Sequence, residues 1–389
     1  HYGWDNAFGE GVTIEARPFL SDALDDVRDE VVDAYDKMIA DLLKKAGEVV
    51  LRDDLELSTF DRAEGLRYLS RLLRAGFTSF IENPGPMHPV FRPMPDMVKM
   101  GLDNPDNYYV SASVNPRDTY RIRGRRRTIH YMSFAAQNQN FAARDKITGG
   151  AGHLNDAEIA LEADGSFEIV ASQEEQPGNW LRLAPDTKQV LLRQTFLHRG
   201  KEQPVEVDIE CVGVEGSPPP LDPARIGGQL AGAAMYAIGC AQWFADWVKG
   251  FEGKAPVNTF HLPTEEHHRF VGGDPNIRIW LGAWRLGPDE ALVIEMTPPE
   301  CHYWNFQLGN VWAESLDFRF HRVHINSGAA EVGPDGSVQL VVGHDDPGHP
   351  NFMTTAGHDH GTMCVRWVRA DSHPEPRCRV VKLAELRGV

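Results

Sequence analysis

Histidine and aspartate side chains are concentrated in the last third of the chain, and they are the first candidates for chemistry. Eleven of the 16 histidines follow residue 255. Four of these histidines lie, together with three aspartates, in two short segments, GHDDPGHPNF at 343–352 and TAGHDHG at 355–361. A histidine beside a carboxylate titrates near neutral pH and can transfer protons. We therefore predict His344 or His358 as a general base, with Asp345 or Asp346 setting its tautomer.

A metal site is a second interpretation of the same side chains. Imidazole and carboxylate ligands suit zinc, iron or manganese, and His358 and His360 would lie on one side of an extended strand. The run at 265–268 (EEHH) adds ligand types, but the HExxH motif is absent. The cofactor therefore stays unknown. A simpler alternative is that these polar residues only cap strand ends in turns.

The segment FRFHR at 318–322 offers an anion-binding group. If it is a strand, alternation places Arg319 and His321 on one face and Arg322 on the other. Guanidinium groups bind carboxylates well and can stabilise an oxyanion. We predict Arg319 and His321 as catalytic and Arg322 as substrate-binding. The alternative is an exposed polar face paired with neighbouring acidic residues.

Aromatic side chains near these groups indicate what a pocket would hold. Tyr303, Trp304 and Trp312 are the candidates for substrate binding, although aromatic rings most often fill sandwich cores. A cleft lined by them would take a flat or apolar ligand, such as an aromatic, sterol-like or carbohydrate molecule. Trp243 and Trp247 are four residues apart in a predicted helix, so they share one face that packs onto this region.

An internal duplication positions these residues. Four sequence echoes occur in the same order, each about 172 residues apart: HYMSF (130–134) with HYWNF (302–306), DGS (164–166) with DGS (335–337), NW (179–180) with NF (351–352), and RQ (193–194) with RW (366–367). Four echoes in register indicate a repeated fold unit. The Asp-Gly pairs favour the positive backbone angles of tight hairpin turns. Segments in which apolar and polar or small residues alternate, such as 277–284 (IRIWLGAW), are typical of antiparallel sheets with one solvent-exposed face.

The fold class that follows is mainly β with α, with two duplicated antiparallel β-sandwich modules, each preceded by helices. Helical periodicity predicts helices over 20–45, over 61–74 with Gly76 closing it, and over 223–248. The proline-rich stretch 83–95 is predicted to be a loop. These elements divide the chain into an N-terminal helical region (1–104), a first module (105–220), a connecting helix and loop (221–274) and a second module (275–389).

The second repeat resembles a bacterial family known as domain of unknown function 1214. The resemblance rests on YWNFQLGNVWAESLDFRFHR at 303–322, on DPGHPNF, and on Arg366-Trp367; the first repeat matches through DGSFEIV, NWL and LLRQ. It covers roughly residues 60–370. The family implies a β-sandwich fold, often with two such units, and no established activity that transfers to this chain.

Composition limits the partners. The formal net charge of −17 would be repelled by phosphate backbones, so we expect no nucleic acid partner. The one basic run, RIRGRRR at 121–127, is interpreted as a hairpin turn with solvated arginines. The apolar stretch 226–247 is interrupted by polar residues, so we expect no membrane span. Five widely spaced cysteines without a CxxC pair, and no visible signal peptide, favour reduced thiols in the cytoplasm.

Three functions remain open at this stage. The first is an enzyme, a hydrolase or lyase, that uses His, Asp and Arg for acid–base chemistry on a small-molecule substrate, with a metal as an optional aid. The second is a ligand- or carbohydrate-binding sandwich without turnover. The third is an assembly protein whose helices form the interface of a homo-oligomer. The motifs of serine hydrolases, P-loop proteins and Rossmann dinucleotide sites are absent.

Overall fold

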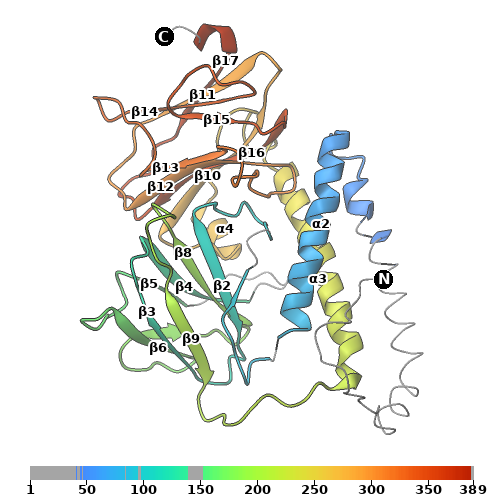
Figure 1. The fold of residues 1–389 in the computed structure, drawn as a ribbon, viewed down its shortest axis with the longest axis vertical. Coiled ribbons are helices and arrows are strands. Elements are labelled where there is room, and N and C mark those ends of the chain that lie inside the picture. The colour runs from blue at the N-terminus through green and yellow to red at the C-terminus, as the bar shows by residue number, and fades with distance from the viewer. Residues whose placement is uncertain are drawn as a thin grey trace, which may run out of the picture.

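The computed structural model describes residues 47–83, 85–94, 98–138 and 152–386, together with residues 41, 44 and 45. The helix predicted over 20–45 lies outside the described residues, apart from those three. Two β-sandwich modules and a pair of long helices make up the described chain (Figure 1). The helices α2 and α3 lie side by side along both modules. The prediction of two duplicated sandwich modules is confirmed.

The first module contains two sheets. Sheet 1A has the strand order β1 (Arg92–Pro93), β2 (Asn107–Ser113), β8 (Gln189–Thr195), β4 (Tyr131–Gln137) and β5 (His153–Asn155). Sheet 1B has the order β7 (Trp180–Arg182), β6 (Ser166–Ser172), β3 (Tyr120–Arg125) and β9 (Glu206–Cys211). Apolar side chains on alternate positions, such as Ile122 and Phe134, fill the space between the sheets. The other face of sheet 1A is left for the cavity described below.

The second module repeats this arrangement except for β1, which has no counterpart in sheet 2A. Sheet 2A has the order β10 (Ile277–Arg285), β16 (His360–Val368), β12 (Tyr303–Gly309) and β13 (His324–Asn326). Sheet 2B has the order β15 (Phe352–Thr354), β14 (Val338–Gly343), β11 (Glu290–Met296) and β17 (Arg377–Lys382), which is followed by the short 3-10 helix η1 (Leu383–Leu386). Trp304, Phe306 and Trp367 lie in its core. The identical strand order shows that the sequence echoes reflect a repeated fold.

Each long helix begins directly after a capping residue, and α2 begins two residues before its predicted start at 61. Ser58 accepts a hydrogen bond from the Asp61 amide (3.1 Å), and the Asp61 carboxylate accepts one from the Ser58 amide (2.8 Å), so a capping box starts α2 (Thr59–Phe80). The helix continues past Gly76, which we had predicted to close it. A Cβ atom at Gly76 would lie 2.5 Å from the Ala233 carbonyl oxygen of α3. Gly76 therefore permits close helix packing and does not end the helix.

The helix α3 (Pro223–Lys249) confirms the prediction for 223–248. Asp222 caps its N-terminus by accepting a hydrogen bond from the Ala224 amide, and proline occupies the first position of the helix. Trp243 and Trp247 stack with ring centroids 6.2 Å apart, as their spacing predicts. A short helix, α4 (Glu265–Phe270), leads from α3 to the second module.

Three local predictions need correction. The basic run at 121–127 is mostly strand β3, and its arginines pair across the sheet with Glu168 and Glu210; the turn comes only at 127–128. The segment 318–322 is not a strand, since residues 318–320 form a turn. Gly165 and Gly336 have the predicted positive φ, 80° and 81°. Their turns begin β6 and β14 and do not join two paired strands.

The two modules meet in a reciprocal contact with approximate two-fold character. The His130 Nε2 atom lies 2.9 Å from the His302 carbonyl oxygen, and the His302 Nε2 atom lies 3.0 Å from the His130 carbonyl oxygen. The two rings stack with centroids 4.3 Å apart. These histidines begin the first sequence echo, so the duplicated segments contact each other as the halves of a symmetric dimer would.

Candidate functional site

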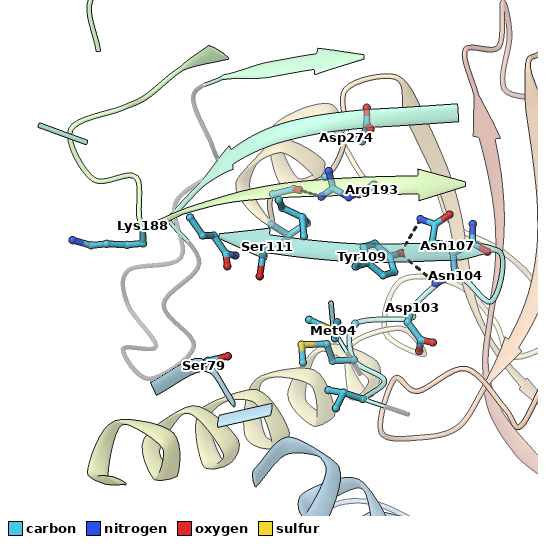
Figure 2. A pocket seen from close by; sticks show the side chains of 18 of the residues that line it. Ser79, Met94, Asp103, Asn104, Asn107, Tyr109, Ser111, Lys188, Arg193 and Asp274 are labelled. Carbon is cyan, nitrogen blue, oxygen red and sulfur yellow. Dashed lines mark hydrogen bonds between the residues drawn. The ribbon is translucent and has the colours of Figure 1, made fainter. Parts of the chain in front are cut away.

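A cavity of about 1020 Å³ lies between the two modules and the helices. It is bounded by the outer face of sheet 1A, by strand β10, by α3 and by the segment that precedes β10 (Figure 2). Its volume is at the upper end of what small-molecule sites in proteins occupy, roughly 300–1,000 Å³. This cavity is the main candidate site.

One wall of the cavity is apolar and largely aromatic. The helix α3 supplies Tyr236, Trp243, Phe244 and Trp247, and β10 supplies Ile277, Ile279 and Leu281. All of these side chains except Ile277 also pack on the core formed by α2, α3 and β10, which holds them in place. An apolar ligand surface would be removed from water against this wall, and that burial is the main source of affinity in such sites.

The opposite wall is polar and is formed by sheet 1A. Tyr109 on β2 lies directly across the sheet from Arg193 on β8. The Tyr109 hydroxyl accepts hydrogen bonds from the Asn107 side chain (2.9 Å) and from the Asn104 amide (3.4 Å), as Figure 2 shows. The Arg193 Nη2 atom donates to the Gly272 carbonyl oxygen at 2.8 Å. Both side chains line the cavity.

A buried carboxylate, Asp274, lies beside this wall. Its Oδ2 atom accepts hydrogen bonds from the hydroxyls of Tyr131 (2.9 Å) and Ser133 (2.6 Å), and its Oδ1 atom accepts one from the Asn276 amide (2.9 Å). The His153 Nε2 atom is 3.0 Å from Oδ1. Burial alone would raise the pKa of Asp274. The contacts with His153, Arg193 and Ser133 outweigh burial and hold the pKa below its usual range.

The second module has a counterpart of this network, formed by the segment before β2. The Tyr303 hydroxyl donates to Asp106 at 2.7 Å, and the same carboxylate accepts from the Asn326 side chain (3.0 Å) and contacts His324 (3.3 Å). Each module is thus completed by a carboxylate from the other module: Asp274 precedes β10 and Asp106 precedes β2, the equivalent strands of the two modules. Such buried, paired groups fix how the modules dock.

The cavity is lined by more basic than acidic side chains. Among its described lining residues, seven are lysine or arginine and two are aspartate. The chain as a whole has the opposite balance, with a net charge of −17. Lys188 and Arg225 are exposed. The cavity therefore favours a ligand with a negative charge over a positively charged one.

Comparisons with known proteins agree with the duplicated fold. Residues 110–195 match the family model described as a protein of unknown function, DUF1214. The solved structure of an uncharacterized protein from Burkholderia cenocepacia aligns with a TM-score of 0.86 and 40% sequence identity, over 90% of this chain and 97% of that chain. The chain belongs to the DUF1214 family.

A protein from Vibrio parahaemolyticus aligns with this DUF1214 protein at a TM-score of 0.48 and 12% identity, over 81% of this chain and 97% of that one. No curated protein matches the sequence. The family assignment thus agrees with the fold and names no substrate.

The predicted catalytic pair His344 and Asp345 lies away from the main cavity of this DUF1214 protein. His344 lines a smaller cavity of about 610 Å³ with Arg285, Glu290 and His360. Its Nδ1 atom is 3.0 Å from the Thr355 hydroxyl. Asp345 is exposed at the following position.

His358 is buried and is held by helix α2. Its Nε2 atom is 2.7 Å from the Glu64 carboxylate, and its Nδ1 atom is 3.1 Å from the Thr355 carbonyl oxygen. Asn310 donates to the same Glu64 carboxylate at 3.0 Å. Burial alone would raise the pKa of Glu64, but the contacts with His358 and Asn310 lower it to about 2. The pair joins α2 to the second module.

The basic residues predicted around the turn at 318–320 are exposed. Arg319 pairs with Asp317 at 2.8 Å, and it is the one predicted catalytic or substrate-binding residue that lines the main cavity. His321 is exposed. Arg322 is also exposed and donates to the Pro350 carbonyl oxygen at 2.5 Å.

The predicted substrate-binding aromatics are buried. Trp304 lies in the core of the second module, and Trp312 donates to the Asp61 carbonyl oxygen (2.8 Å) under helix α2. Tyr303 is held by Asp106, as described above. These positions agree with the default that aromatic rings fill sandwich cores.

Within the described ranges, no group of three or more His, Cys, Asp or Glu side chains is arranged to hold a metal ion. No helix in the described part of the chain is long and apolar enough to cross a membrane. All five cysteines are free thiols.

Sequence reasoning missed Tyr109, Arg193 and Asp274. The prediction rests on groups that one repeat has gained, whereas Arg193 and Asp274 have counterparts in the other repeat, Arg366 and Asp106, and Tyr109 has none. The signal was present, because Arg193 and Arg366 form one of the four echoes and Tyr131 and Tyr303 belong to another.

Proposed function

We propose that this DUF1214 protein binds a small, mainly apolar organic molecule, aromatic or sterol-like, in the cavity between its modules. The observation that carries the proposal is an aromatic wall opposite a short polar wall, in a cavity large enough for a multi-ring body. The apolar wall favours these ligands over a carbohydrate, which would leave many hydroxyls without hydrogen-bond partners.

The test uses a fluorescent apolar probe, 1-pyrenebutanol, and a variant that fills the cavity. Ser111 lies on β2 and lines the cavity, and its small side chain is partly exposed, so Ser111→Trp adds bulk without entering the sandwich core. Ser217, in an exposed loop, provides the matched control Ser217→Trp. We expect the probe to bind the unmodified protein and the control equally, and Ser111→Trp at least about tenfold more weakly, because lost apolar contact lowers affinity. Equal binding by all three proteins, or none by any, would contradict the proposal.

A second candidate function, acid–base catalysis by a hydrolase or lyase, is favoured by the smaller cavity. Two histidines, His344 and His360, line it together, and the His360 Nδ1 atom is 2.5 Å from the Asp359 carboxylate. A histidine oriented by a carboxylate is a common general base. We propose His344 as the base, in line with the sequence prediction; it lines the cavity beside His360, which is the histidine that the Asp359 carboxylate orients.

Hydrolysis of an aryl ester such as p-nitrophenyl butyrate tests this candidate. We expect a rate above that of the protein-free buffer, which His344→Ala removes and His373→Ala, a variant of a histidine outside this cavity, retains. The same rate in both variants would count against it.

A further inference from the structure

The duplication provides an internal comparison for the polar wall of the cavity. In sheet 1A the residues Tyr109, Arg193 and Ser133 lie in one row across the strands, and in sheet 2A the equivalent row is Ile279, Arg366 and Asn305. Both arginines are anchored in the same way. Arg193 donates to the Gly272 carbonyl oxygen, and Arg366 donates to the Leu102 carbonyl oxygen.

The two arginines differ in their second hydrogen-bond partner. The Arg366 Nη1 atom donates to the Gln307 Oε1 atom at 2.5 Å. Ala135 occupies the equivalent position in the first module, two residues after Ser133 on β4. The Arg193 Nη1 atom is buried and has no hydrogen-bond partner among the described residues. A buried cationic donor without a partner is costly, and a bound acceptor would remove that cost.

Tyr109 adds a second donor at the same place. Its hydroxyl accepts two hydrogen bonds, from Asn107 and from the Asn104 amide, and its own proton has no acceptor within the described ranges. Directly opposed residues on neighbouring antiparallel strands have Cβ atoms about 5 Å apart. The side chains of Tyr109 and Arg193 therefore start from neighbouring points on the cavity wall. In the second module the hydroxyl is missing, because Ile279 replaces Tyr109.

Asp274 does not supply the missing acceptor for Arg193 and Tyr109. Its two oxygens already accept from Tyr131, Ser133 and the Asn276 amide, and its Oδ1 atom also faces His153. The excess of basic residues around the cavity stabilises a further negative charge there. We infer that the ligand bound in this cavity carries a carboxylate, which Arg193 and Tyr109 hold while the apolar body lies against α3 and β10. The inference rests on the proposed function and adds the chemical class of the ligand.

The experiment compares two probes that differ only in this group, 1-pyrenebutyrate and 1-pyrenebutanol. We expect the unmodified protein to bind the acid about 10- to 100-fold more tightly than the alcohol, the range for hydrogen bonds to charged groups. Arg193→Gln, which keeps a donor near the Gly272 carbonyl, removes this preference by weakening the binding of the acid. Tyr109→Phe reduces the preference in part.

A second variant tests the same contact without removing Arg193, and its substitution is copied from the equivalent position of the second module. Ala135→Gln places beside Arg193 the partner that Arg366 already has, and it also removes the preference for the acid. Arg225→Gln at an exposed lining position is the matched control for loss of one positive charge, and it retains the preference. Thermal melting of each variant verifies that it is folded.

The outcomes separate the two proposals. If neither probe binds the unmodified protein, the proposed function fails and this inference fails with it. If both probes bind equally, the cavity binds apolar molecules but the carboxylate inference is wrong. If the preference survives in Arg193→Gln and Ala135→Gln, or is lost equally in Arg225→Gln, Arg193 does not recognise the acid and the inference is also wrong.

Discussion

The close packing of α2 against α3 makes Gly76→Ala an informative perturbation. The helix α3 forms one wall of the main cavity, and its distance from α2 is set by Gly76. An added Cβ atom would lie 2.5 Å from the Ala233 carbonyl oxygen and 3.1 Å from the Ala233 Cα atom, whereas Cβ contacts shorter than 3.0 Å essentially never occur. The neighbour is backbone, so no side chain can rotate away. The helices must separate.

Two effects of opposite sign decide the magnitude. Replacing glycine by alanine within a helix stabilises it by about 1 kcal/mol. Overpacking of a tight contact costs about 1–3 kcal/mol. We expect the clash to win, because the contact is with backbone and is surrounded by the buried core of α2 and α3. The predicted net effect is a loss of up to about 2 kcal/mol in the free energy of unfolding.

Gly228→Ala is the matched control. Gly228 lies in α3, and a Cβ atom there would meet no atom within 4 Å. Only the helix-propensity effect remains, so this variant gains about 1 kcal/mol. Urea unfolding followed by circular dichroism measures both variants. If Gly76→Ala were as stable as Gly228→Ala, the proposed steric role of Gly76 would be refuted.

Two further predictions concern ionisable groups. The pKa of Glu64 lies at about 2, below its ordinary value of 4.5, so its contribution to stability is present above about pH 4.5 and is lost as the pH falls towards 2. Glu64→Gln removes the ion pair with His358. Between pH 4.5 and pH 2 we therefore expect its free energy of unfolding, measured with urea, to fall less than that of the unmodified protein. An equal fall in both proteins would show that the pair with His358 does not stabilise the fold. Burial raises the pKa of the Cys301 thiol to about 11 and that of Cys378 to about 12. We expect five thiols to react rapidly with Ellman's reagent in urea and few in native buffer at pH 7.5, and rapid reaction of Cys301 in the native protein would contradict the burial of this thiol.

The elements that depend on local sequence were predictable. The apolar spacing identified α3 to within one residue at its end, and the Asp-Gly pairs identified Gly165 and Gly336 as residues with positive φ. The position of helix α2 was predicted correctly but its length was predicted too short. Gly76 suggested a helix end, whereas its role is to allow close contact with Ala233 of α3. The duplication and the family resemblance together identified the sandwich modules. The predicted segment boundaries after residues 104, 220 and 274, and the predicted catalytic roles, stay predictions.

The candidate site depended on contacts that local sequence does not contain. Arg193 and Arg366 occupy equivalent positions in two repeats, yet of the two only Arg193 has a buried Nη1 atom that lacks a hydrogen-bond partner among the described residues, because Ala135 stands where the second repeat has Gln307. Asp274 faces a strand of the other module more than 100 residues earlier in the chain. The sequence by itself determined the duplication and the local turns and caps, because these follow from repeated residues and backbone preferences. Only the tertiary structure decided which strand faces surround a cavity, because that depends on how the two modules and α3 dock.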